Sequence, residues 1–214
     1  MNGREILASG LAQLGVVLPG LEERLWAYFE LVQSENARFG LVKFSGPQEF
    51  VAKHLLDSLA PAGLLGGLIG ESATASWVDL GSGAGLPGIP LALLFPGVTL
   101  TLAERKGKRA LFLELAKSKL GLNNVRLWPR PFEELKERFS VVTFRAFSPL
   151  DPALIKLVKR VLLPGGRIVA YKGRRAVLDA EVAGISSLAA ECSVFPLKVP
   201  FLEEERHAVV LRFE

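Results

Sequence analysis

A glycine-rich stretch at residues 77–88, W-V-D-L-G-S-G-A-G-L-P-G, carries the clearest chemical signal in this 214-residue sequence. Three glycines at alternate positions let the backbone turn sharply and approach a ligand with no Cβ in the way. The apolar residues before them predict a short buried strand, and Pro87 suits the first turn of a following helix. A strand, a glycine loop and a helix N-terminus together indicate a nucleotide-type site. Its expected ligand-binding residues are Asp79, Gly81, Gly83 and Gly85.

Two classes of cofactor use such a loop. Residues 83–88 match the G-x-G-x-x-G pattern of dinucleotide-binding proteins. Asp79, two residues before the first glycine, instead suits a ligand with an ammonium or sulfonium group and would repel a pyrophosphate. D-x-G-x-G-x-G is the pattern with which Rossmann-like methyltransferases hold S-adenosylmethionine. The stretch therefore favours S-adenosylmethionine, and a glycine-rich turn without any ligand is the purely structural alternative.

Four residues outside the loop are further candidates. Glu104 ends a predicted second strand, where an acidic residue can bind the ribose hydroxyls; alternatively it caps the next helix or pairs with Lys108. Phe132 can cover one face of an adenine while Glu133 reaches the polar edge of the ring, and a plain core role for Phe132 is the alternative. Arg145 follows a predicted fourth strand into the same crevice and is the candidate catalytic residue.

The elements that position these residues alternate between helix and strand. Apolar residues at helical spacing predict helices over 6–14 and 21–32, and a third from Gly46 that ends near Pro61 and the Gly66-Gly67 pair. Strands are predicted at 77–80, 98–103, 124–128, 140–144, 167–171, 193–199 and 208–213, with helices at 106–120, 131–134, 150–163 and 176–190. We expect an N-terminal helical cap over residues 1–70, packed on an α/β core over residues 71–214 whose last two strands pair antiparallel.

The charge is unevenly distributed along the chain. The whole sequence has a net charge of +4, but residues 1–76 carry 5 Lys+Arg and 8 Asp+Glu, and residues 105–175 carry 18 Lys+Arg and 5 Asp+Glu, a local excess of +13. Such a basic block beside a cofactor site suggests a polyanionic substrate, since neutralising phosphates drives nucleic-acid binding. An ordinary solvated surface of lysine and arginine is the alternative.

Several classes of protein are disfavoured by composition. No run of 18 apolar residues occurs, and residues 1–18 lack the features of a signal peptide, so we expect a cytoplasmic protein that does not bind a membrane. Cys192 is the only cysteine, which excludes an internal disulfide. His54 and His207 are the only histidines, so we expect no metal cofactor.

Five motifs, in order along nearly the whole chain, resemble those of the ribosomal RNA small subunit methyltransferase G family, also called glucose-inhibited division protein B. They are K-H-L-L-D-S at 53–58, D-L-G-S-G-A-G-L-P-G-I-P at 79–90, G-K-R at 107–109, R-A-F at 145–147 and E-R-H at 205–207. The resemblance implies a Rossmann-like class I S-adenosylmethionine-dependent methyltransferase, with a seven-stranded, mostly parallel sheet and an antiparallel C-terminal strand.

The same resemblance implies an activity and its contacts. The implied reaction is methyl transfer from S-adenosylmethionine to N7 of a guanine in 16S ribosomal RNA, with the RNA or the small ribosomal subunit as partner of a monomeric enzyme. Its cofactor contacts correspond to Gly81, Leu86, Glu104, Phe132-Glu133 and Arg145. The family usually shows W-N-x-x-x-N-L-T after the second helix, whereas this chain has Gly40 and Val42 in place of the second asparagine and the threonine.

The residues can be checked against this chemistry. Guanine N7 presents a lone pair, so attack on a sulfonium methyl needs alignment and no general base. Methylation of pyrimidine C5 needs a cysteine nucleophile, and Cys192 lies far along the sequence from the crevice. Enzymes that methylate exocyclic amines commonly carry N/D-P-P-Y/F after the fourth strand, where this chain has R-A-F at 145–147. A ring nitrogen or an oxygen is therefore the favoured acceptor. An NAD-dependent oxidoreductase and an RNA-binding protein with an inactive cofactor site are the alternative functions.

Overall fold

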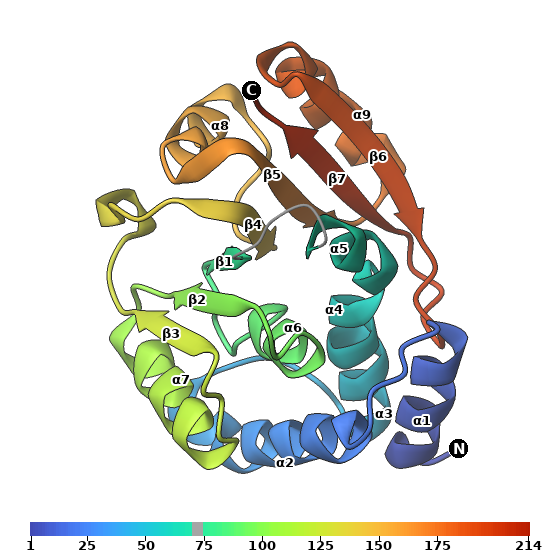
Figure 1. The fold of residues 1–214 in the computed structure, drawn as a ribbon. Coiled ribbons are helices and arrows are strands. Elements are labelled where there is room, and N and C mark those ends of the chain that lie inside the picture. Colours follow the sequence, from blue (N-terminus) through green and yellow to red (C-terminus); the bar gives the residue numbers. More distant parts are fainter. Residues whose placement is uncertain (70–74) are drawn as a thin grey trace.

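The computed structural model describes residues 1–69 and 75–214, which form a seven-stranded sheet covered by helices on both faces (Figure 1). The strand order is β3-β2-β1-β4-β5-β7-β6. Strands β1 to β5 are parallel, and β7 runs antiparallel to both of its neighbours, as predicted. The strands are β1 Ser76–Leu80, β2 Thr99–Ala103, β3 Val125–Trp128, β4 Phe139–Arg145, β5 Leu162–Lys172, β6 Glu191–Leu197 and β7 Arg206–Arg212.

The sheet separates two layers of apolar side chains. Alternate residues of β1 point to opposite faces, so Trp77 packs with the cap while Val78 and Leu80 pack on the far side. The cap helices share the first face with α6 Gly88–Leu94 and α7 Gly107–Lys119 (Figure 1). The second face is covered by α8 Pro152–Lys159 and α9 Arg175–Ile185. Burial on both faces explains why the inner strands are almost continuously apolar.

The first cap helix begins, and the second ends, at residues suited to those positions. In α1, Gly3–Gln13, Asn2 and Glu5 form a reciprocal capping box. In α2, Leu21–Phe39, the helix ends at Gly40, which has φ +62°. Both glycine and asparagine accept this left-handed conformation, so Gly40 satisfies the turn where the family usually has asparagine. The Asn36 side chain closes the turn by accepting from the backbone N–H groups of Leu41 and Val42 at 3.1 Å each.

The third predicted helix is more complex than the sequence indicated. It consists of α3 Pro47–Phe50, a π-helix at Val51–Leu56 and α4 Asp57–Leu59. A further helix, α5 Ala62–Ile69, continues through the Gly66-Gly67 pair, where the predicted helix ended. The glycines do not break α5 because its leucines pack into the core, with Leu65 fully buried. The expected boundary between cap and core, at residues 70 and 71, lies outside the described residues.

The boundary between α8 and β5 also differs from prediction. Helix α8 ends at Lys159 rather than at 163, and β5 begins at Leu162, so that residues 164–166, predicted to close the helix, lie inside the strand. Leu162 already pairs with Phe139, and the register shifts before Val141 pairs with Arg167. The Pro-Gly-Gly sequence is tolerated at this irregularity because residues 163–166 lie between the paired positions Leu162 and Arg167, and Gly165 takes a left-handed φ of +71°. Short 3-10 turns lie at Phe132–Glu134 and Ser186–Leu188.

Candidate functional site

A cavity of about 520 Å³ opens at the carboxyl ends of β1, β2 and β4. Four of the predicted site residues line it: Gly81, Glu104, Phe132 and Glu133. The other predicted site residues, Asp79, Gly83, Gly85, Leu86 and Arg145, are absent from its lining. We call this space the first cavity. Its position at the strand ends is the position at which open α/β sheets bind ligands.

Glu104 is nearly buried and fixes the geometry of the glycine loop. Its Oε2 accepts from the backbone N–H of Gly83 at 2.9 Å, and its Oε1 accepts from the N–H of Lys106 at 2.8 Å. Lys106 is the N-cap residue that precedes α7, so Glu104 binds the backbone at the start of that helix, much as the cap alternative drawn from sequence requires. A carboxylate has about four lone-pair sites, so both oxygens keep capacity for hydroxyl donors in the cavity. The cap role and the ribose role are therefore compatible.

Asp79 lies beneath the loop rather than in the cavity. It is fully buried, its Oδ2 accepts from the N–H of Gly88 at 3.3 Å, and its Oδ1 accepts from the Thr143 hydroxyl at 3.3 Å. Burial raises the pKa of this carboxyl to about 7, an effect partly offset by hydrogen bonds from Ser82, Gly88 and Thr143. A direct ion pair between Asp79 and a ligand, the basis of its selection from sequence, is not what this geometry offers. Its side chain points to the buried face because Trp77 and Asp79 lie on the same side of β1.

The glycines of the loop have different reasons for being glycine. Gly81 has φ +67°, and a Cβ built there would lie 2.3 Å from Cδ2 of Phe147. A Cβ at Gly85 would lie 2.4 Å from Cδ1 of Ile89, so Gly85 serves the packing of α6. A Cβ at Gly83 would meet no atom closer than 3.7 Å. Among these three glycines, Gly81 is thus the one whose backbone is approached most closely by a side chain of the first cavity.

Aromatic side chains form one wall of the first cavity. Phe132 is 6% exposed and its ring centroid lies 5.7 Å from that of Phe147 in an edge arrangement. The Trp128 indole N–H donates to the carbonyl of Pro131 at 2.9 Å, which holds the turn that carries Phe132. Phe132 is therefore both a core residue and a cavity wall, so the two interpretations of the sequence describe one position. Glu133, beside it, is exposed.

A second cavity, of about 490 Å³, lies between the cap and the ends of β4 and β5. It shares Ala146 and Ser148 with the first cavity, so the two spaces meet at the segment that follows β4. Arg145 lines this second cavity: its Nη1 donates to Asp57 Oδ2 at 2.7 Å and to the Lys53 carbonyl at 3.2 Å. Arg145 is predicted from sequence to be a cofactor contact together with Gly81, Glu104 and the Phe132-Glu133 pair. The structure instead places Arg145 in the second cavity and those residues in the first.

His54 also lines the second cavity. Its surroundings determine the charge of the ring, and its hydrogen bonds determine which ring nitrogen carries the proton. Burial and the nearby Arg145 guanidinium lower its pKa to about 4, so the ring is neutral at pH 7. Its Nδ1 lies 3.4 Å from Arg145 Nη2, which can only donate, and its Nε2 lies 3.4 Å from the Lys43 carbonyl, which can only accept. The proton is therefore on Nε2. Both ring nitrogens contact protein groups, so His54 is not poised as a general base.

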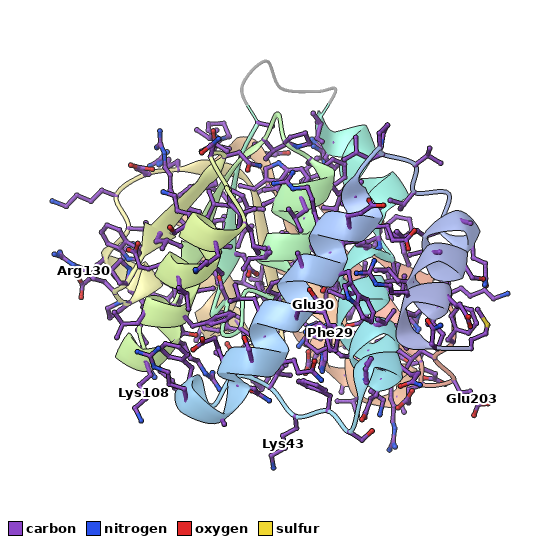
Figure 2. All side chains as sticks on the ribbon, turned by 90° about the horizontal axis from the view of Figure 1, so that it is seen from below. Phe29, Glu30, Lys43, Lys108, Arg130 and Glu203 are labelled. Carbon is purple, nitrogen blue, oxygen red and sulfur yellow. The ribbon has the colours of Figure 1, made fainter. Side chains whose placement is uncertain are left out.

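Basic side chains surround the mouth of the site. Arg105, Lys106, Arg109 and Arg130 line the first cavity. Lys43 after α2 and Lys108 on α7 project from the same end of the molecule, and Arg130 extends from its side (Figure 2). Not every residue of the basic block is available: Lys172 Nζ lies 2.6 Å from Glu181, and Arg175 Nε lies 2.6 Å from Asp179. The exposed cations beside the first cavity are thus the better candidates for contacts with a polyanion.

The glycine loop offers little to a pyrophosphate. In dinucleotide-binding proteins, backbone N–H groups at the loop and helix N-terminus receive the phosphates. Here the N–H of Gly83 is bonded to the Glu104 carboxylate, and the N–H of Gly88, the first residue of α6, is bonded to Asp79. A ligand with a ribose and no pyrophosphate suits this arrangement better.

Comparison with known proteins decides between a dinucleotide-binding protein and a methyltransferase. The family model described as rRNA small subunit methyltransferase G matches residues 21–210. The protein named ribosomal RNA small subunit methyltransferase G from Treponema pallidum strain Nichols is 39% identical over 213 residues, covering 96% of this chain and 92% of that protein. Its namesake from Cupriavidus pinatubonensis strain JMP 134 is 36% identical over 219 residues, covering 97% and 93%. This chain belongs to that family. It is a ribosomal RNA methyltransferase of the S-adenosylmethionine-dependent kind, as the motif resemblance predicted.

Solved structures support the class of fold. A putative O-methyltransferase from Klebsiella pneumoniae superposes with a TM-score of 0.60 at 14% identity, covering 97% of each chain. The N-methyltransferase NodS from Bradyrhizobium japonicum, solved with S-adenosylhomocysteine, superposes with a TM-score of 0.58 at 14% identity, covering 86% of this chain and 98% of that chain. The methyltransferase fold predicted from the sequence is confirmed.

Membrane spans and metal clusters are both missing from residues 1–69 and 75–214. Within these ranges the helices are all too short or too polar to cross a membrane. The same ranges contain no group of three or more His, Cys, Asp and Glu side chains that could hold a metal ion.

Proposed function

We propose that this enzyme transfers a methyl group from S-adenosylmethionine, bound in the first cavity, to N7 of a guanine in 16S ribosomal RNA. The carrying observation is that Glu104, directly after the second strand, faces the same cavity as Gly81 and Phe132. An acidic group for a ribose, a glycine backbone for close approach and an aromatic wall for an adenine are the parts this cofactor requires. The cofactor supplies an electrophilic methyl group on a sulfonium.

The residues of the chain would bind and align rather than exchange protons. Glu104 would accept from the ribose hydroxyls, and Gly81 would allow the methionine part to pass close to the backbone. N7 of guanine carries its own lone pair, so alignment is the main requirement. The neutral His54, with both ring nitrogens in contact with protein groups, is consistent with a reaction that needs no base.

The RNA would approach across the basic residues beside the first cavity, with its target guanine entering the second. The two cavities adjoin at the shared residues Ala146 and Ser148, and direct methyl transfer demands that the two binding sites be neighbours. The 16S RNA or the small subunit would be the partner, and we propose a cytoplasmic, monomeric enzyme.

The test is methyl transfer with tritiated S-adenosylmethionine into 16S RNA from a host that lacks the family enzyme, with the modified base then mapped. We expect one labelled guanine, whose N7-methylation is revealed by chain cleavage after borohydride and aniline treatment. Label at an exocyclic amine or a ribose would refute the N7 assignment. RNA binding without label would favour the inactive binding protein, and a thermal shift with NAD but none with S-adenosylhomocysteine would favour the oxidoreductase.

A further inference from the structure

Three sequence motifs that are far apart in the chain meet at one carboxylate, that of Asp57. Asp57 Oδ2 accepts from Arg145 Nη1 at 2.7 Å, and Asp57 Oδ1 accepts from Arg206 Nε at 2.9 Å. The Asp57 side chain is 4% exposed, that of Arg145 16% and that of Arg206 24%. The carboxylate is therefore buried, with one arginine on each oxygen, and it is shielded from direct contact with a substrate.

Arg145 comes from the end of β4, yet its acceptors in the described part of the chain belong to the cap. These are the Asp57 carboxylate, the Lys53 carbonyl and Nδ1 of His54. Lys53 and His54 lie in the π-helix Val51–Leu56, a type of turn that is often found at functional sites. Arginine has five N–H donors, so these three contacts fix the guanidinium plane and leave donors for another acceptor.

Charge in the second cavity is dominated by these two arginines. The other two cations of its lining are already paired, Lys53 with Glu49 and Glu204, and Lys172 with Glu181. Arg145 and Arg206 share a single carboxylate, which leaves an excess of positive charge at the wall of the cavity. A guanine nucleotide presents an O6 acceptor and an anionic phosphate, both of which suit guanidinium donors. Arginine N–H groups that donate to O6 leave the neighbouring N7 free for methylation only if the arginines are held in one position.

We propose that Asp57 is a positioning residue for the methyl transfer: it holds Arg145 and Arg206 in the orientation in which they receive the guanine nucleotide in the second cavity. This inference rests on the proposed function. Asp57 acts through the arginines and touches neither the cofactor nor the base. This positioning role also explains why a carboxylate is buried on the apolar face of a cap helix, where its burial requires a paired cation.

A double-mutant cycle tests this. The variants are Asp57→Asn, Arg145→Gln and the two combined, with Glu191→Gln as matched control, because Glu191 pairs with Arg212 at the opposite end of β7. We expect Asp57→Asn to lower kcat/KM for RNA by about tenfold or more, as for a broken buried charge pair. The double variant should lose less than the two single losses combined, because either change alone removes the Asp57–Arg145 contact and only the Arg206 part of the Asp57 effect remains. Glu191→Gln should behave as wild type.

The affinity for S-adenosylhomocysteine, measured by calorimetry, separates positioning from mere stability. It should stay within about twofold of wild type in each variant, since neither residue lines the first cavity. Additive losses in the cycle, or a fall in cofactor affinity that parallels the loss of activity, would overturn the inference. If Asp57→Asn does not fold, Arg206→Gln replaces it, and normal kcat/KM for RNA in that folded variant would equally overturn it. Failure of the wild type to methylate 16S RNA would instead reject the proposed function.

Discussion

Replacing Glu104 by alanine would test the cofactor site most directly. The carboxylate is 5% exposed and bridges the N–H groups of Gly83 and Lys106. Its loss removes the proposed pair of charged hydrogen bonds to the ribose and leaves two backbone donors without their acceptor. Hydrogen bonds to a charged group contribute about 1.5–3 kcal/mol each, and water entering the cavity would recover part of that. We expect S-adenosylhomocysteine binding to weaken by about 1–3 kcal/mol, which is about 5- to 150-fold.

Isothermal calorimetry at neutral pH gives this loss directly, and thermal unfolding without ligand gives the separate cost to the fold. Removing the bond at the start of α7 should lower stability by about 1 kcal/mol, the usual loss for a helix cap. Glu114→Ala is the control, because Glu114 is exposed on the same helix and outside the first cavity. It should leave both the affinity and the unfolding temperature unchanged.

The result that would refute the ribose role is a folded Glu104→Ala protein with unchanged affinity for S-adenosylhomocysteine. A lower unfolding temperature in that protein would then show that Glu104 only caps α7 and braces the glycine loop. A loss of affinity with no loss of stability would show the opposite, that the cavity-facing lone pairs carry the whole effect.

Three further changes probe the loop, the basic surface and the buried acid. Gly81→Ala should weaken S-adenosylhomocysteine binding by about tenfold or more by calorimetry, because its methyl would meet a phenylalanine ring at 2.3 Å in a left-handed backbone. Lys106→Ala with Lys108→Ala should flatten the slope of log K for RNA against log[salt] by about 1.4–1.8, whereas Lys119→Ala, at the other end of α7, should not. Because the pKa of Asp79 is about 7 in the fold and 3.8 ordinarily, ionising it destabilises the fold as pH rises from about 4 to 7. Asp79→Asn should therefore gain relative stability over that window, by at most about 4 kcal/mol in denaturant unfolding at pH 8.

The parts of the site that could be predicted from sequence are those set by local spacing. A strand, a glycine loop and a helix follow one another within 18 residues, 77–94, and their order alone places Gly81 at the carboxyl edge of the sheet. Glu104 is likewise placed by the end of β2, which pairs directly with β1. What the sequence does not distinguish is which face of β1 carries Asp79, because an inner parallel strand is apolar on both faces.

The Asp57 pairings illustrate what local patterns do not contain. Asp57 and Arg145 are 88 residues apart, and Asp57 and Arg206 are 149 apart. No periodicity links such positions, because they meet only once the cap has packed against β4 and β7. The sequence did hold one usable signal: Asp57 falls among the apolar residues Leu55, Leu56 and Leu59, and a carboxylate buried at such a position needs a cationic partner.

The cap lines the second cavity and supports the loop beside the first, so it is more than a cover for the sheet. The buried Tyr28 of α2 donates its hydroxyl to the Ala84 carbonyl in the glycine loop at 2.7 Å, so the cap supports the loop of the first cavity. On the other side, Tyr171 of β5 donates to the Ser58 carbonyl at 2.9 Å, beside the carboxylate that holds Arg145. Burial raises the pKa of both tyrosines, so each is a neutral donor at pH 7. A shift of the cap would therefore move the glycine loop and the arginine wall together, and under the proposed function the cap would be the element that keeps methyl donor and methyl acceptor aligned.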